Sequence, residues 1–112
     1  MRAINIKEGQ TLQGRMMEAT TTTDPTATSI WHDSLPIDNI LEKNTGVDFN
    51  GLTAVVLVGL PTQGCPVVVT EAIIRNVDTV THSFEIFIDE GGTESFVAAF
   101  TLDSGDYWPL SS

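Results

Sequence analysis

The chain has 112 residues, which is the size of one domain, and its apolar content of 41% is sufficient for one hydrophobic core. Its 5 basic and 15 acidic residues give a formal net charge of −10. This charge excludes a protein that binds nucleic acid on its own, because phosphate neutralisation needs a basic face, and it disfavours an anionic membrane surface. No apolar run approaches the roughly 20 residues of a spanning helix, and the first residues lack the apolar segment of a secretion signal. We therefore expect a soluble product made in the cytoplasm, with no nucleic-acid or membrane partner.

The segment 1–28 is predicted to be an extended N-terminal arm or edge segment, followed by one β-sandwich domain at 29–112. The sequence of residues 8–18 does not by itself establish whether this stretch is helical. The threonine-rich tract at 20–26 is β-branched and is interrupted by Pro25, which favours an extended arm, an edge strand or a loop over a helix. Residues 30–38 are expected to form a loop attached to the core, and a short helical turn is expected to start at Ile37 and to stop before Gly46.

From residue 51 onward the pattern is typical of β-structure, because apolar and β-branched runs alternate with Gly, Pro, Asn and Asp. The connections between these runs are short, which predicts an antiparallel meander. The fold class expected is all-β: an antiparallel β-sandwich or compact barrel with a C-terminal meander and an extended N-terminal arm. The predicted strands are 53–58, 67–76, 81–89, 93–102 and 107–110.

The hairpin around the Gly-Gly pair allows a specific register to be predicted. A three-residue loop ending at Gly92 would place Ile86 opposite Phe96 and Phe84 opposite Ala98, so that the apolar faces of the two strands coincide. A two-residue turn would mix the faces. The longer loop also predicts a positive φ and a bulge at Gly92.

The outer face of this hairpin is not fully polar, because Phe87, Val97 and Ala99 lie on it. Two explanations stay open. The N-terminal half or a second sheet could cover these side chains, or the patch could be a subunit interface.

The candidate catalytic and metal-binding residues favour a protein without catalysis, cofactor or metal. His32 and Asp33 are adjacent, so on a strand they would point apart, and no nucleophile can be placed beside them. His82, at a strand end on the apolar face, is expected to be a packing residue, and two isolated histidines do not make a zinc site. The single Cys65 permits no intrachain disulfide and is expected to be an inert thiol.

Acidic residues gather in two turns, at 89–90 and 103–106, where Asp is also favoured for backbone reasons. A calcium site would need six or more oxygen atoms from converging loops. Because these turns could lie at opposite edges of a meander, no metal site is predicted. A stacking platform for a sugar ring, formed by Trp31, Tyr107 and Trp108, is an alternative to packing in the core.

Residues 73–108 contain three motifs in a fixed order. An Asn-x-Asp turn at Asn76-Val77-Asp78 ends a strand, a hairpin closes on Asp89-Glu90-Gly91, and a Leu-x-x-Gly corner at 102–105 leads to the aromatic Tyr107. This arrangement resembles a segment common in small virion proteins of tailed bacteriophages. The chain departs from the usual small residue in the corner by carrying Asp103 and Asp106.

The resemblance implies a component of the virion. We expect a non-enzymatic capsid decoration protein that stabilises the head and docks on the assembled shell, its partner being the major capsid protein or another virion protein. A homo-oligomer, with a trimer favoured, would dock through sheet faces and extended termini. The alternatives are a tail or fibre component and a carbohydrate-binding β-sandwich module. The candidate interface residues are Ile4, Ile6, Leu12, Thr21, Thr23, Phe87, Val97 and Ala99.

Overall fold

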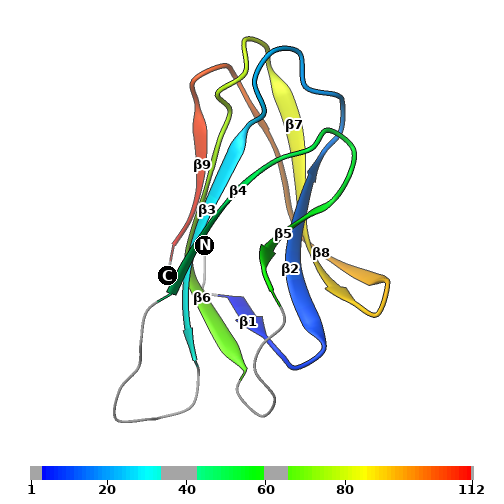
Figure 1. The fold of residues 1–112 in the computed structure, drawn as a ribbon, viewed down its shortest axis with the longest axis vertical. Helices are drawn as coiled ribbons and strands as arrows, with labels where there is room; N and C mark the ends of the chain where they lie inside the picture. Colours follow the sequence, from blue (N-terminus) through cyan, green and yellow to red (C-terminus); the bar gives the residue numbers. More distant parts are fainter. Residues whose placement is uncertain (1–3, 34–42, 60–65, 112) are drawn as a thin grey trace.

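The structure of the chain is a computed structural model, and it describes residues 4–33, 43–59 and 66–111. Within these ranges the chain forms nine β-strands and no helix, so it has no helix that could span a membrane. Two antiparallel sheets pack face to face (Figure 1), which confirms the predicted β-sandwich. The first sheet contains, in spatial order, β1 (Ile4–Ile6), β6 (Val67–Arg75), β3 (Thr26–Asp33) and β4 (Lys43–Asp48), with β9 (Tyr107–Ser111) also paired to β6. The second contains β5 (Val55–Val58), β2 (Gln10–Met16), β7 (His82–Glu90) and β8 (Thr93–Leu102).

The core lies between the sheets and follows the period of two that β-strands impose. On β2, Leu12 and Met16 are fully buried, and Gly14 lies between them on the same face. A Cβ atom at Gly14 would lie 2.9 Å from Cδ1 of Ile86 and 3.0 Å from a ring carbon of Phe49. A larger residue at position 14 would therefore force Ile86 and Phe49 to shift, because these two core side chains occupy the space beside the glycine.

The segment 1–28 is part of the sandwich over its described residues rather than an arm that extends from it. β1 pairs with β6 at the edge of the first sheet, as an edge segment would. β2 lies in the interior of the second sheet, between β5 and β7. Residues 20–25 of the threonine-rich tract lie in the loop that carries the chain from β2 to β3, and Thr26 begins β3.

Residues 30–38 were expected to form a loop, but β3 continues as a strand to Asp33. β4 begins at Lys43, inside the range where a helical turn was expected; residues 37–42 of that range lie outside the described residues. The reason is tertiary pairing. β3 lies between β6 and β4 in the sheet, so its peptide groups have partners on both sides that no local pattern reveals.

The predicted meander is wrong in its connectivity. The chain changes sheets between β6 and β7, and β9 returns to the first sheet to pair with β6 instead of β8. The connections are as short as expected, but a short connection can also form a corner between two sheets. As described below, buried polar side chains hold that corner.

The predicted register of the β7–β8 hairpin is also wrong. Glu90 pairs with Thr93 across a two-residue turn, in which Gly91 and Gly92 have φ of 60° and 94°. Two positive φ angles are those of the type I′ turn that matches strand twist, so the positive φ expected at Gly92 is confirmed. The apolar faces are brought together by a bulge at Val97, since Phe87 pairs with Phe96 and Ile86 pairs with Ala98.

Candidate functional site

Three loops meet at one end of the sandwich, at the top of Figure 1: residues 17–25, 76–81 and 103–106. A connected set of polar groups joins them. We call it the Asp78 network; it comprises the side chains of Glu18, Asn76, Asp78 and His82 and the backbone amides of 21–23. Three of these side chains, Asn76, Asp78 and His82, are fully buried.

The Asp78 carboxylate is the centre of the network. It accepts hydrogen bonds from the backbone amides of Thr21, Thr22 and Thr23 at 2.8, 2.9 and 3.1 Å, and from that of Thr79 at 2.8 Å. Burial acts to raise the pKa of Asp78, but the hydrogen bonds from His82 and from these amides outweigh it and hold the pKa well below its usual range. The carboxylate therefore stays charged and binds the threonine-rich tract through its backbone.

His82 joins two carboxylates through its two ring nitrogens. Nε2 lies 2.6 Å from Oδ2 of Asp78, and Nδ1 lies 2.8 Å from Oε1 of Glu18. Burial acts to lower the pKa of His82, but the hydrogen bonds to Asp78 and Glu18 prevail and raise it above the ordinary value. The geometry fits an imidazolium, because each nitrogen must carry a proton to donate to a carboxylate.

Asn76 joins the loop 76–81, which connects β6 to β7, to the loop 103–106, which connects β8 to β9. Its side-chain nitrogen donates to the carbonyl oxygens of Val80 and Leu102, both at 2.9 Å. Its backbone amide donates to Asp106 O at 2.9 Å, and its carbonyl accepts from the amide of Gly105 at 2.8 Å. The network thus provides hydrogen-bond partners for the buried side chains of Asn76, Asp78 and His82.

Two of the three sequence motifs at 73–108 contribute residues to this network. The Asn-x-Asp turn provides the buried side chains of Asn76 and Asp78, which hydrogen-bond to the neighbouring loops. The Leu-x-x-Gly motif provides Gly105, whose φ is 87°. The sequence predicted His82 to be a partly buried packing residue at a strand end, but it did not predict full burial or the carboxylate partners. The signal that could have indicated one of them is the spacing of Asp78 and His82, four residues apart across a turn.

The second candidate surface is the outer face of the β7–β8 hairpin. Phe87 is 1% exposed although it lies on that face, because the Arg15 guanidinium covers its ring at 4.6 Å from the centroid. Arg15 is held there by Glu94, at 2.9 Å, and by Glu85. The hydrogen bond to Arg15 lowers the pKa of Glu94, and the pKa of Arg15 is raised, chiefly by Glu94. The cover expected from a second sheet or a subunit is thus supplied, at Phe87, by a residue of the same sheet.

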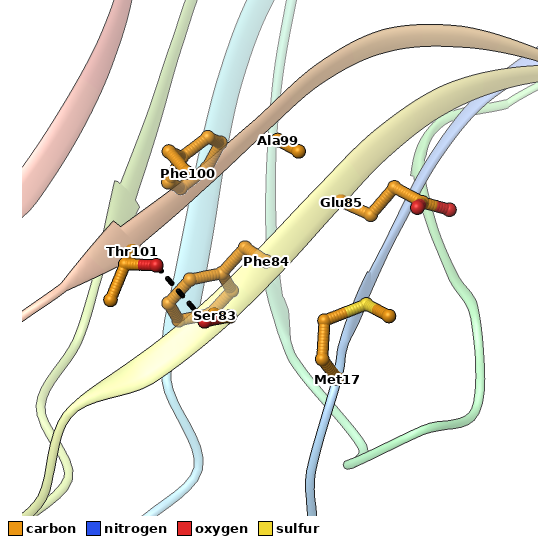
Figure 2. A pocket seen from close by; sticks show the side chains of 7 residues that line it. All are labelled: Met17, Ser83, Phe84, Glu85, Ala99, Phe100 and Thr101. Atoms are coloured by element: carbon orange, nitrogen blue, oxygen red, sulfur yellow. Dashed lines mark hydrogen bonds between the residues drawn. The ribbon is translucent and has the colours of Figure 1, made fainter.

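A shallow groove of about 310 Å³ lies on this face beside Ala99 (Figure 2). Its floor comes from β7 and β8, where Ser83 and Thr101 are joined through their hydroxyl groups at 3.0 Å. Met17, just after β2, forms one side of the groove. The groove is lined by Met17, Ser83, Phe84, Glu85, Ala99, Phe100 and Thr101.

The structure distributes the candidate interface residues over three environments. Those with side chains on the surface offer the groups that a partner could reach, whereas those in the core are used within the chain. Ile6, Leu12 and Phe87 are fully buried, Ile4 and Val97 are half-buried against the core, and Thr21, Thr23 and Ala99 are exposed.

Phe96 was missed as a candidate, and it is the most exposed large apolar side chain among the described residues, at 70%. It lies on β8, whose residues 93–96 are all exposed. β8 is an edge strand, and the hairpin turn extends away from the first sheet at the lower right of Figure 1. The two-residue turn and the bulge at Val97 place Phe96 on the outer face, and neither feature was predicted.

The aromatic residues considered for sugar stacking do not share a surface. Trp108 stacks on Phe100 with ring centroids 4.4 Å apart and an interplanar angle of 6°, and Trp31 is partly buried against the core. Tyr107 is 55% exposed, with the Arg75 guanidinium 5.4 Å from its ring centroid. Only one of the three rings is therefore available on the surface.

The remaining candidates form neither a metal site nor a catalytic site among the described residues. The two acidic turns lie at opposite ends of β8, which at ten residues is about 30 Å long, so they do not converge. Within the described ranges no group of His, Cys, Asp and Glu could hold a metal ion. His32 is half-buried near the end of β3, and Cys65 lies outside the described residues.

Comparisons of the chain with family models, with curated proteins and with solved structures found no match.

Proposed function

We propose that the chain is a non-enzymatic bacteriophage capsid decoration protein that docks on the assembled shell as an oligomer. The observation that carries the proposal is the protruding β7–β8 hairpin with the exposed ring of Phe96. The phage shell as the partner comes from the motifs at 73–108, which resemble small virion proteins. A tail or fibre component would use the same kind of docking at another place in the particle.

The hairpin has the properties of a preformed docking element. Arg15, clamped by Glu85 and Glu94 over the ring of Phe87, stiffens the β2–β7–β8 part of the sheet. Phe96 then projects from an ordered support, and exposed aromatic side chains are frequent anchors in protein interfaces. Docking would not require the hairpin to fold first, which reduces the entropic cost of binding.

The charge of the chain favours a partner with a basic docking surface. The hairpin tip carries Asp89, Glu90 and Glu94, and the nearby Arg15 is already paired. Opposite charge on the shell would steer association and raise its rate, whereas other copies of the chain would be repelled at this tip. Self-association into a trimer would therefore use a surface other than the hairpin tip.

The proposal is tested by the presence of the chain in purified virions, measured by mass spectrometry, and by adding purified chain back to particles that lack it. We expect wild-type chain to co-sediment with the particles at a fixed ratio. Phe96→Ser should weaken binding at least tenfold, because it removes the apolar anchor. The matched control is Val80→Ser, at a 40% exposed position in the loop at the opposite end of the sandwich, which should bind like wild type.

Three outcomes would contradict the proposal. The chain could be absent from virions, it could fail to rebind, or Phe96→Ser could bind as well as Val80→Ser. Light scattering of the purified protein gives the oligomeric state, for which we expect a trimer.

A further inference from the structure

We propose that Glu18, His82 and Asp78 form a proton-dependent clamp that holds the segment following β2 against β7. The clamp would be closed when both nitrogens of the His82 ring carry a proton and would open at Glu18 when the ring loses one. This inference is independent of the docking function proposed above.

The contacts of the ring require two protons for full closure. The His82 side chain is 1% exposed, and its two nitrogens lie 2.8 and 2.6 Å from oxygen atoms of Glu18 and Asp78. A neutral imidazole has one N–H donor and one lone pair. With a neutral ring, one of the two carboxylates would face a lone pair at hydrogen-bond distance, which is repulsive.

The two carboxylates are held differently, and this difference determines which contact opens. Asp78 is fully buried and is held by the amides of 21–23 and of Thr79, whatever the charge of the ring. The side chain of Glu18 is 43% exposed, and it also accepts a hydrogen bond from the Ser83 amide at 2.7 Å. Glu18 can regain water by moving outward, whereas Asp78 cannot. Loss of the proton at Nδ1 therefore releases Glu18.

The charged groups around the ring act in one direction. Glu18 and Asp78 contact it directly, and the same loops carry Asp24, bonded to Thr20, and Asp103, bonded to Thr81. Each of these carboxylates favours the charged form of the ring. Opening thus occurs on the alkaline side of the titration.

Release of Glu18 would have a local consequence. The preceding residue, Met17, donates its amide to Ser83 O at 2.9 Å, and its side chain lines the groove on the outer face of β7 and β8 (Figure 2). The amide of Ser83 loses its acceptor when Glu18 leaves. Opening would loosen this side of the groove while the amides of 21–23 stay bound to Asp78.

The test is an NMR titration of the full chain that follows the ring nitrogens of His82 and the exchange of backbone amides with solvent. We expect both nitrogens to be protonated at pH 5. The Ser83 amide should lose its protection through the same midpoint as the ring, beyond the ordinary effect of pH on exchange, while the amides of 21–23 keep theirs.

Glu18→Gln separates the clamp from simple burial of the ring. It keeps the size of the side chain and an acceptor for the Ser83 amide but removes the charge, so the His82 midpoint should fall by about one unit. The matched control is His32→Gln, which removes the other histidine of the chain and should leave the midpoint unchanged. The proposal is overturned by one unprotonated ring nitrogen at pH 5, by constant Ser83 protection, or by an unaltered midpoint in Glu18→Gln. The ring-nitrogen measurement on the wild-type chain decides the first point without any variant.

Discussion

The two ends of this sandwich use carboxylates in opposite ways. At the loop end, Asp78 is fully buried and is surrounded by donors from three segments. At the hairpin, Glu85 and Glu94 lie on the surface and hold Arg15 over an aromatic ring. The first arrangement orders loops that would otherwise lack partners for their amides, and the second stiffens a hairpin whose backbone already has its sheet partners. The comparison shows that the acidic residues do not act only through surface charge, because the buried carboxylate of Asp78 holds loops of the fold together.

The largest effect is expected at the buried end. Asp78→Asn replaces an acceptor that serves four backbone amides and His82 by a group that also donates, so it leaves buried donors without a partner. We expect the melting temperature to fall by roughly 10 °C or more. Asp103→Asn, in a neighbouring loop with an exposed hydrogen bond to Thr81, is the control and should shift it by less than about 3 °C. Equal shifts for both variants would remove the distinction between the two kinds of carboxylate.

The dependence of stability on pH sharpens the comparison next. The pKa of Asp78 is lowered in the fold, so its contribution is present above the unfolded value of about 4 and is lost as the pH falls through the folded pKa. The pKa of His82 is raised, so its contribution is complete below about 6.5 and is lost as the pH rises through the folded pKa. Urea unfolding over a pH series should therefore show the greatest contribution of the network between about pH 4 and 6.5. His32→Gln should retain this profile, and a flat profile in the wild type would argue against the charged network.

The smallest effect is expected at the hairpin. Arg15→Met keeps an apolar cover over Phe87 but removes the charge, and we expect the melting temperature to fall by roughly 5 °C at low salt. Because the partners of Arg15 are partly exposed, 0.5 M salt should reduce the difference from wild type, whereas the effect of Asp78→Asn should persist. Arg75→Met, which removes the guanidinium beside the exposed ring of Tyr107, is the matched control, with a smaller effect. A salt-insensitive Arg15→Met would show that the ion pairs do not hold the cover.

Much of the strand content could be predicted because alternation is a local property. The predicted strands 67–76, 81–89, 93–102 and 107–110 agree closely with β6, β7, β8 and β9. β2 was harder to predict, since Gly14 interrupts its apolar face between Leu12 and Met16. The glycine is explained only by its neighbours in space, Ile86 and Phe49.

The candidate site could be predicted only in part. His82 was predicted to be a partly buried packing residue and Asn76-Val77-Asp78 to be a turn. The hydrogen bonds from the threonine-rich tract to Asp78, however, join residues more than fifty positions apart. The inward or outward direction of Phe96 depended on the turn length and on the bulge at Val97. A one-residue change of register moves every side chain to the other face, so an error at the turn hides a surface residue.

The sequence by itself determined the all-β class, the acidic character and the C-terminal strands, because these depend on composition and on the two-residue period of a strand. The tertiary structure decided which sheet each strand joins, the place of β2, β3 and β4, the register of the hairpin and the partners of His82. These features rest on pairing between distant segments, and the stability of such a pairing is a property of both partners and of the core they enclose.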